Sequence, residues 1–110
     1  MYYLQSMPRD YTFYVYILTN PQKTMLYIGF TNSLVRRLPQ HRDNRGKKET
    51  FAGRNFCYIL IYYEVFQYVN DAIAREKQLK KWSRSKKEEL IATKNPNWLS
   101  LNINFIDVED

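Results

Sequence analysis

The sequence has few of the features that mark secreted or membrane proteins. It contains one cysteine, Cys57, among 110 residues, which excludes an intramolecular disulfide and a cysteine-based zinc cluster. The longest apolar run, residues 57–63, is far shorter than the roughly 20 residues that a membrane-spanning helix needs. The N-terminus has no basic segment followed by an apolar one. We therefore expect a cytoplasmic protein without a membrane span, in which Cys57 is a small buried residue.

The chain has fewer acidic residues than basic ones. Lys and Arg number 17 and Asp and Glu 11, for a net charge of +6. All the basic residues except Arg9 and Lys23 fall within 36–54 or 75–94. Positive charge gathered beside aromatic residues is typical of a polyanion-binding face, and we favour nucleic acid. A solvated surface, anionic lipid and an acidic protein partner are the alternatives.

The length of the chain predicts one domain over residues 1–110, enough to bury roughly two-thirds of the surface of the unfolded chain. Its core is expected at about 11–101, with 102–110 as an acidic tail. The first twelve residues show no sustained period and predict an irregular lead-in.

The first regular pattern predicts a β-hairpin. Runs 13–18 and 25–30 are rich in β-branched and aromatic residues and are separated by a polar break. Antiparallel pairing would bring Tyr16 and Tyr27 together, with Gly29 leaving room for a ligand to approach the backbone. Tyrosine also favours half-buried strands, so a purely structural role is the alternative for each.

A helix is predicted after the hairpin, capped by Thr31 and Asn32. Arg37 and His41 are four residues apart and would share one face of that helix. Pro39 lies between them and costs a helix interior about 3 kcal/mol or more. The helix is therefore expected to kink or end there, which leaves the position of His41 open.

The middle of the chain changes from polar to apolar. Residues 43–54 carry two glycines and predict a mobile basic loop, either a source of phosphate contacts or simply solvated. Residues 56–66 are nearly continuously apolar, which predicts a central strand covered on both faces.

The next pattern predicts an amphipathic helix capped by Asn70. Its buried stripe is expected to comprise Ala72, Ile73, Leu79 and Trp82. Glu76 falls inside that stripe, where an unpaired carboxylate is costly. Glu76 is therefore a candidate metal ligand or catalytic group, and the alternative is a salt bridge to a buried arginine such as Arg37.

The last third predicts one further helix. Ser85 begins a capping-box pattern, and the helix is expected to stop at Asn95. Trp98 and Leu101 are expected to close the core. Residues 103–110 are predicted as an edge strand or a loose tail.

Taken in order, the motifs Tyr-x-Tyr, Tyr-Ile-Gly, Arg-Arg-Leu-x-x-His and Ala-Arg-Glu-Lys-Gln-Leu-Lys-Lys-Trp resemble the GIY-YIG nuclease superfamily. The chain is most similar to its small, single-domain bacterial endonucleases, over about residues 11–101. The resemblance implies an α+β fold of order β-β-α-β-α-α, with helices flanking a three-stranded antiparallel sheet. It departs from the family where Tyr14 and Val15 replace Gly-Ile, and at Pro39.

The resemblance also implies a function: metal-dependent endonuclease cleavage of nucleic acid, DNA rather than RNA, with Mg²⁺ or Mn²⁺. Glu76 would be the metal ligand. The implied catalytic residues are Tyr16, Tyr27, Arg37, His41 and Glu76. A non-catalytic nucleic-acid-binding module is the alternative, and either Asn95 or Asn102 could match the family's C-terminal asparagine.

Candidate contacts to nucleic acid come mainly from the two basic segments. They are Gly29, Arg36, Arg42, Lys47, Lys48, Arg54, Arg75, Lys77, Lys80, Lys81 and Arg84.

Overall fold

The computed structural model describes residues 12–106, so the predicted lead-in and the end of the tail lie outside the described residues. A three-stranded antiparallel sheet in the order β2-β1-β3 forms its centre. The strands are β1 (Phe13–Thr19), β2 (Leu26–Thr31) and β3 (Ile59–Phe66). The helices are α2 (Leu34–Asp43), α3 (Phe51–Arg54), α4 (Val69–Lys80), α5 (Arg84–Ala92) and the 3-10 helix η2 (Asn102–Phe105). The predicted α+β class and the hairpin are confirmed.

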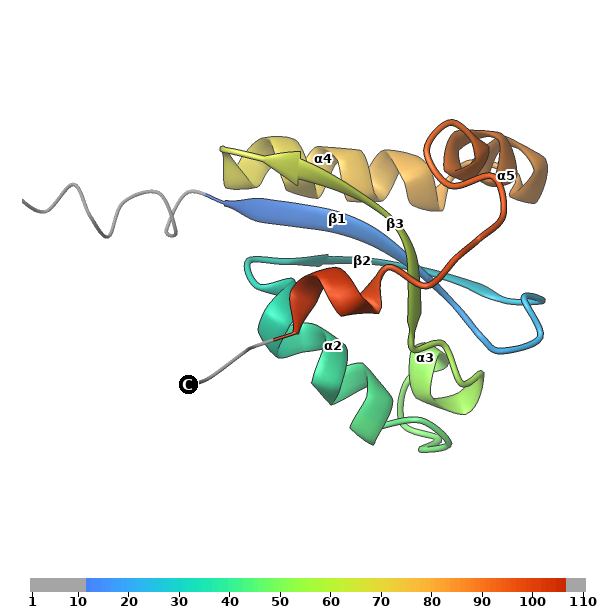
Figure 1. The fold of residues 1–110 in the computed structure, drawn as a ribbon. Coiled ribbons are helices and arrows are strands. Elements are labelled where there is room, and N and C mark those ends of the chain that lie inside the picture. Colours follow the sequence, from blue (N-terminus) through green and yellow to red (C-terminus); the bar gives the residue numbers. More distant parts are fainter. Residues whose placement is uncertain (1–11, 107–110) are drawn as a thin grey trace, which may run out of the picture.

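The sheet is covered on both faces. Helices α4 and α5 lie over one face, and α2, α3 and η2 lie over the other (Figure 1). Alternation along β1 sends Val15 and Ile17 toward α4 and sends Tyr16 and Leu18 toward α2. The α4-side core contains Val15, Ile17, Ile28, Ile61, Tyr62, Ala72, Leu79 and Ile91. The α2-side core contains Tyr16, Leu18, Leu34, Leu38, Ala52, Cys57 and Leu60.

β3 is an edge strand, and β1 is the central one. The prediction of a central strand at 56–66 is therefore wrong. Leu60 packs in the α2-side core, while Ile61 and Tyr62 pack in the α4-side core. The continuous apolar run thus reflects two covered faces, which an edge strand between two helical layers also has.

Helix α2 passes through Pro39 and continues to Asp43, so the predicted end of the helix at Pro39 is wrong. Its cap is Ser33, and not Thr31 or Asn32; the Ser33 hydroxyl accepts a backbone hydrogen bond from the first turn at 3.2 Å. Pro39 lies on the exposed side, and its neighbour Leu38 is buried in the core. Packing of α2 against the sheet offsets the one backbone bond that proline removes.

The segment 43–54 is not a loop throughout, so the prediction of a loop over this whole range is wrong. It contains α3, which Thr50 caps by accepting a hydrogen bond from the backbone of Gly53 at 3.0 Å. A Cβ atom at Gly53 would lie 2.8 Å from the Asn44 carbonyl oxygen, so this glycine lets the loop fold tightly onto the helix. Ala52 anchors α3 in the α2-side core.

The N-caps of both later helices lie two residues before the predicted ones. The cap of α4 is Tyr68 in place of Asn70. The cap of α5 is Ser83 in place of Ser85, because the Ser83 hydroxyl accepts a hydrogen bond from the Lys86 backbone at 3.2 Å. The predicted buried stripe is confirmed in part: Ala72 and Leu79 are buried, Ile73 and Trp82 are half-buried, and Trp82 lies beyond the end of α4.

The C-terminal segment turns back over the sheet. Helix α5 ends at Ala92, before the expected stop at Asn95. The buried Asn95 amide donates to the Ile61 carbonyl at 2.9 Å, which ties the turn after α5 to β3. The predicted core roles of Trp98 and Leu101 are confirmed. The tail forms η2 where an edge strand or loose tail was expected. No helix within residues 12–106 is long and apolar enough to cross a membrane.

Candidate active site

Three aromatic side chains meet on the α2 side of the sheet. Tyr16 of β1, Tyr27 of β2 and His41 of α2 have ring centroids 5.4–6.2 Å apart. The Tyr16 hydroxyl lies 2.8 Å from Nε2 of His41, within hydrogen-bond distance. The antiparallel register places Tyr27 diagonally across from Tyr16, as the hairpin pattern predicts.

Gly29 makes this meeting possible. Tyr16 pairs with Gly29 across the two strands, and its ring lies over the glycine. The space that we expected to admit a ligand is therefore filled by the Tyr16 ring. Gly29 itself is buried, and its lack of a side chain leaves room for the Tyr16 ring.

His41 reaches the two tyrosines because α2 continues past Pro39. Burial, together with the nearby Arg37 charge, lowers the pKa of His41 from 6.5 to about 4. The imidazole is therefore neutral at neutral pH and one of its nitrogens is a free proton acceptor.

Tyr16 is 1% exposed. Burial raises its pKa, and Tyr27 and the negative charge of Glu76 raise it further, while Arg37 opposes them. Tyr16 therefore holds its proton at neutral pH. Its hydroxyl can act as a base only if that proton passes to an acceptor, and the neutral His41 is in contact with it.

Arg37 lies one helical turn before His41 on the same helix face. Its side chain is exposed and donates a hydrogen bond to Gln40 at 3.2 Å. The Arg37 charge acts on the pKa of both Tyr16 and His41. An exposed guanidinium beside these two groups could contact a substrate phosphate.

Glu76 approaches from α4, in the layer on the other side of the sheet. Its side chain is only 19% exposed, and Lys80 forms an ion pair with Oε2 at 3.2 Å. The structure thus gives Glu76 a different partner from Arg37, the alternative considered above. The Glu76 charge nevertheless reaches Tyr16, since it raises the pKa of that phenol.

The donor set around Glu76 fits a hard cation held by a single protein ligand. Oε1 of Glu76 accepts no hydrogen bond from residues 12–106, so one oxygen is available. The same residues contain no group of three or more His, Cys, Asp or Glu that could hold a metal ion. Mg²⁺ is commonly bound by one or two carboxylates, with water and substrate phosphate completing its shell.

Two of the predicted nucleic-acid contacts, Gly29 and Arg75, are buried or bonded to other residues of the fold. Besides the buried Gly29, Arg75 is committed to Glu64 through two hydrogen bonds of 2.8 and 2.9 Å. Tyr62 donates to the same carboxylate at 2.5 Å, and the Arg75 guanidinium lies over the Trp82 ring. This network joins β3 to α4, so Arg75 already has partners within the fold.

The other predicted contacts have exposed side chains. They are Arg36, Arg42, Lys47, Lys48, Arg54, Lys77, Lys80, Lys81 and Arg84. Arg84 is partly occupied, because it pairs with Glu88 at 2.8 Å and donates to the Thr24 carbonyl. The remaining residues are exposed cations on both helical layers, each accessible to a polyanion.

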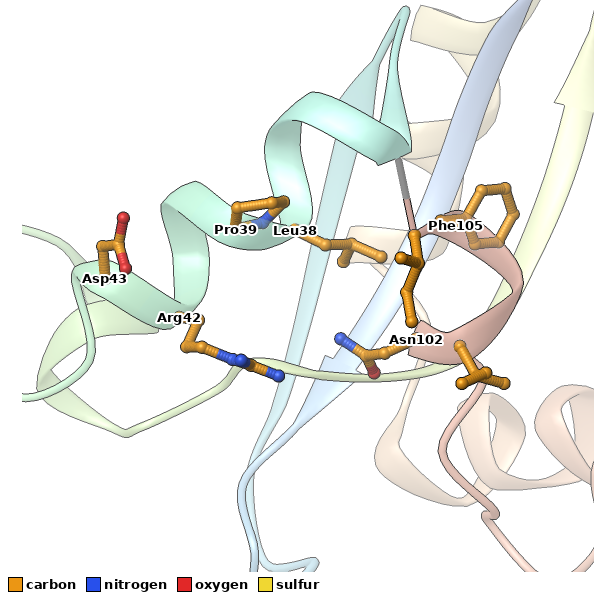
Figure 2. Close-up of a pocket in the computed structure, with 8 residues that line it drawn as sticks. Leu38, Pro39, Arg42, Asp43, Asn102 and Phe105 are labelled. Atoms are coloured by element: carbon orange, nitrogen blue, oxygen red, sulfur yellow. The ribbon is translucent and has the colours of Figure 1, made fainter. Parts of the chain in front are cut away.

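A separate cavity of about 510 Å³ lies between α2 and η2. Figure 2 shows Leu38, Pro39, Arg42 and Asp43 on the α2 side, facing Asn102 and Phe105 on the η2 side. None of the three clustered rings lines it. The candidate active site is therefore distinct from this cavity.

The sequence reasoning missed two features of the site. The pairing of Glu76 with Lys80 was readable from their spacing of four residues, which places them on one helix face. Phe51 lines a cavity together with Tyr27, and no sequence signal indicated this, since it depends on how α3 folds back onto the sheet.

Comparison with known proteins agrees with the family resemblance that the sequence motifs indicated. A family model described as the GIY-YIG catalytic domain matches residues 12–89. A UPF0213 protein of Clostridium perfringens is 39% identical over 82 residues, covering 74% of this chain and 85% of the relative. One from Pediococcus acidilactici is 38% identical, covering 80% and 87%. The solution NMR structure of a Bacillus halodurans UPF0213 protein is 30% identical with a TM-score of 0.52, covering 89% and 99%.

Proposed function

Because the chain belongs to the GIY-YIG family, we propose that it is an endonuclease that hydrolyses phosphodiester bonds in DNA with Mg²⁺ or Mn²⁺. A GIY-YIG catalytic domain implies nuclease-type cleavage of nucleic acid. The observation that best supports the proposal is the 2.8 Å contact between the Tyr16 hydroxyl and His41, within the field of Glu76.

The proton path we propose follows the 2.8 Å contact between the Tyr16 hydroxyl and Nε2 of His41, and the two pKa shifts define the protonation states from which it starts. Tyr16 is a neutral phenol and His41 a neutral imidazole at pH 7. As the Tyr16 oxygen takes a proton from the attacking water, the phenol proton passes to Nε2 of His41. The water oxygen forms the new bond to phosphorus, and the leaving oxygen departs with the bonding electron pair.

Two further side chains would act on the phosphate. The exposed Arg37 guanidinium would stabilise negative charge on the non-bridging oxygens. The Tyr27 hydroxyl would orient the water or the phosphate, because its ring lies beside both Tyr16 and His41.

Glu76 would hold the divalent cation through its available oxygen. When bound, the ion would act as a Lewis acid on a phosphate oxygen. Glu76 supplies one negative charge, and its partner Lys80 would be free to move to the substrate.

The proposal is tested by incubating the purified protein with supercoiled, branched and single-stranded DNA and with RNA, with and without Mg²⁺ or Mn²⁺. Tyr16→Phe is expected to lower the cleavage rate by about 10² or more, since it removes the proton relay. The matched control is Tyr14→Phe, which removes a hydroxyl from the same face of β1, where the Tyr14 ring packs against Phe105.

The outcomes separate an enzyme from a binding module. Metal-dependent nicking that is lost in Tyr16→Phe and kept in Tyr14→Phe supports the proposal. If no substrate is nicked under any condition, the enzymatic assignment fails. Cleavage of RNA alone would overturn the choice of DNA.

A further inference from the structure

The outer edge of β2 carries a cavity, most of whose lining residues have no role in the proposed catalysis. It has a volume of about 260 Å³. Its lining residues are Leu26, Tyr27, Ile28, Phe51, Lys80 and Lys87. Leu26 and Ile28 pack with the α4-side core, while Tyr27 packs with the α2-side core. Since residues from both faces of β2 line one cavity, that cavity runs along the open edge of the strand.

Both helical layers reach this edge cavity. Phe51 comes from α3, on the α2 side of the sheet. Lys80 and Lys87 come from α4 and α5, on the other side. The cavity therefore has aromatic and aliphatic walls with two ammonium groups. It shares the Tyr27 ring with the candidate active site.

Packing in the core does not account for the exposed position of the Phe51 ring. Its side chain is 41% exposed, and it makes no aromatic ring contact with residues 12–106. Its backbone is nevertheless held in place: the next residue, Ala52, is 4% exposed and Thr50 caps the helix. A large ring presented on an anchored backbone offers a stacking surface at a small cost in conformational entropy.

The two lysines add the complementary charge. Lys80 keeps 53% of its side chain exposed while it pairs with Glu76, and Lys87 is half-buried at the cavity wall. An aromatic platform next to cations is the arrangement by which proteins hold a nucleobase and its phosphates without reading sequence. The volume lies below the roughly 300 Å³ at which clefts for drug-sized ligands begin, which suits a single planar group.

We infer that the edge cavity binds one nucleobase of the substrate, next to the phosphate that is cut. The base stacks on Phe51, and the phosphate on its far side lies against Lys80 and Lys87. The inference rests on the proposed function, because Tyr27 is common to the cavity and to the catalytic rings. It follows that this base must leave the stack of its neighbour when the substrate binds.

The test measures binding by the uncut complex, so that it does not depend on catalysis. In a Tyr16→Phe background, the affinity for a short oligodeoxynucleotide is compared with that for an abasic chain with the same number of phosphates. The Tyr16→Phe protein is expected to bind the base-containing chain roughly tenfold to a hundredfold more tightly than the abasic chain, the usual effect of one stacked base. Phe51→Ala should lose most of this preference, and Phe51→Trp should keep it.

The matched control is Phe56→Ala. Phe56 is 48% exposed, close to the value for Phe51, and it does not line the edge cavity. The control should keep the full preference for the base-containing chain. Lys87→Gln should lower the salt dependence of binding by about one unit of slope for both chains. Thermal melting confirms that each variant is folded.

An unchanged preference in Phe51→Ala would overturn the inference, and so would an equal loss in Phe56→Ala. Failure of the proposed function looks different. If the protein never nicks nucleic acid but its preference for the base-containing chain still depends on Phe51, the proposed reaction fails and the base-binding cavity stands.

Discussion

Gly29 lies directly opposite Tyr16 in the pairing of β1 with β2, and a Cβ atom at Gly29 would lie 2.5 Å from the Tyr16 hydroxyl oxygen. This contact connects the hairpin to the chemistry of the site. The Tyr16 ring can lie over the strand only because its partner has no side chain. With the ring in that position, the hydroxyl reaches His41 of α2.

Gly29→Ala is therefore expected to displace the Tyr16 ring and break its hydrogen bond to His41. We expect cleavage to fall at least tenfold, and the free energy of unfolding to fall by about 1–3 kcal/mol from overpacking. Gly46→Ala is the control, since Gly46 has φ +86° and lies outside the site. It should cost stability through backbone strain and leave the cleavage rate of the folded protein unchanged. Equal activity of the Gly29 variant and the wild type would contradict the proposed role of the contact.

Lys80 is expected to compete with a divalent cation for Glu76. Removing this partner by Lys80→Gln should tighten Mn²⁺ binding to the free protein by roughly two- to fivefold, the usual strength of an ion pair four residues apart. Lys81→Gln is the control, because Lys81 has no ion pair with residues 12–106. Isothermal titration calorimetry provides the measurement. Glu76→Gln should abolish the binding, and retained Mn²⁺ affinity in that variant would remove Glu76 as the ligand.

The hydrophobic pattern predicted the main strands and helices, because alternation and helical spacing indicate which side of an element is covered, and the class of the fold came from the family resemblance. The pattern did not give the order of the strands. The apolar run before Phe66 reads as a central strand, and only the sheet pairing shows that β3 is an edge strand between two helical layers. Sequence pattern reports burial, and an edge strand can be as buried as a central one.

The candidate site could be assembled from the order of its motifs, but its local geometry could not. The rule against proline within a helix predicted a kink or an end at Pro39, yet α2 continues because tertiary packing outweighs one lost backbone bond. Similarly, Arg75 looks like one more surface cation in sequence. Its partner Glu64 is on a different element, and such pairs depend on the tertiary arrangement.

Arg75 is expected to contribute to stability and not to nucleic-acid binding. Arg75→Met would leave Glu64, 15% exposed, without its partner and should lower the free energy of unfolding by about 2–3 kcal/mol. The slope of log affinity for DNA against log salt should not change. Lys81→Gln should show the reverse, with near-normal stability and a slope smaller by about one. Chemical denaturation and binding titrations at several salt concentrations test both, and a smaller slope in Arg75→Met would return Arg75 to the interface.

The stability of the protein should fall on acidification because of His41. The pKa of His41 is about 4 in the folded protein against 6.5 for the unperturbed group. Between those values the unfolded chain binds more protons, so the free energy of unfolding decreases as pH is lowered from about 6.5 to 4. Since the ring is partly exposed, we expect a loss on the order of 1 kcal/mol. His41→Gln should lack this component. Urea denaturation of both proteins from pH 7 to pH 4 measures it, and parallel curves would show that His41 titrates with an ordinary pKa.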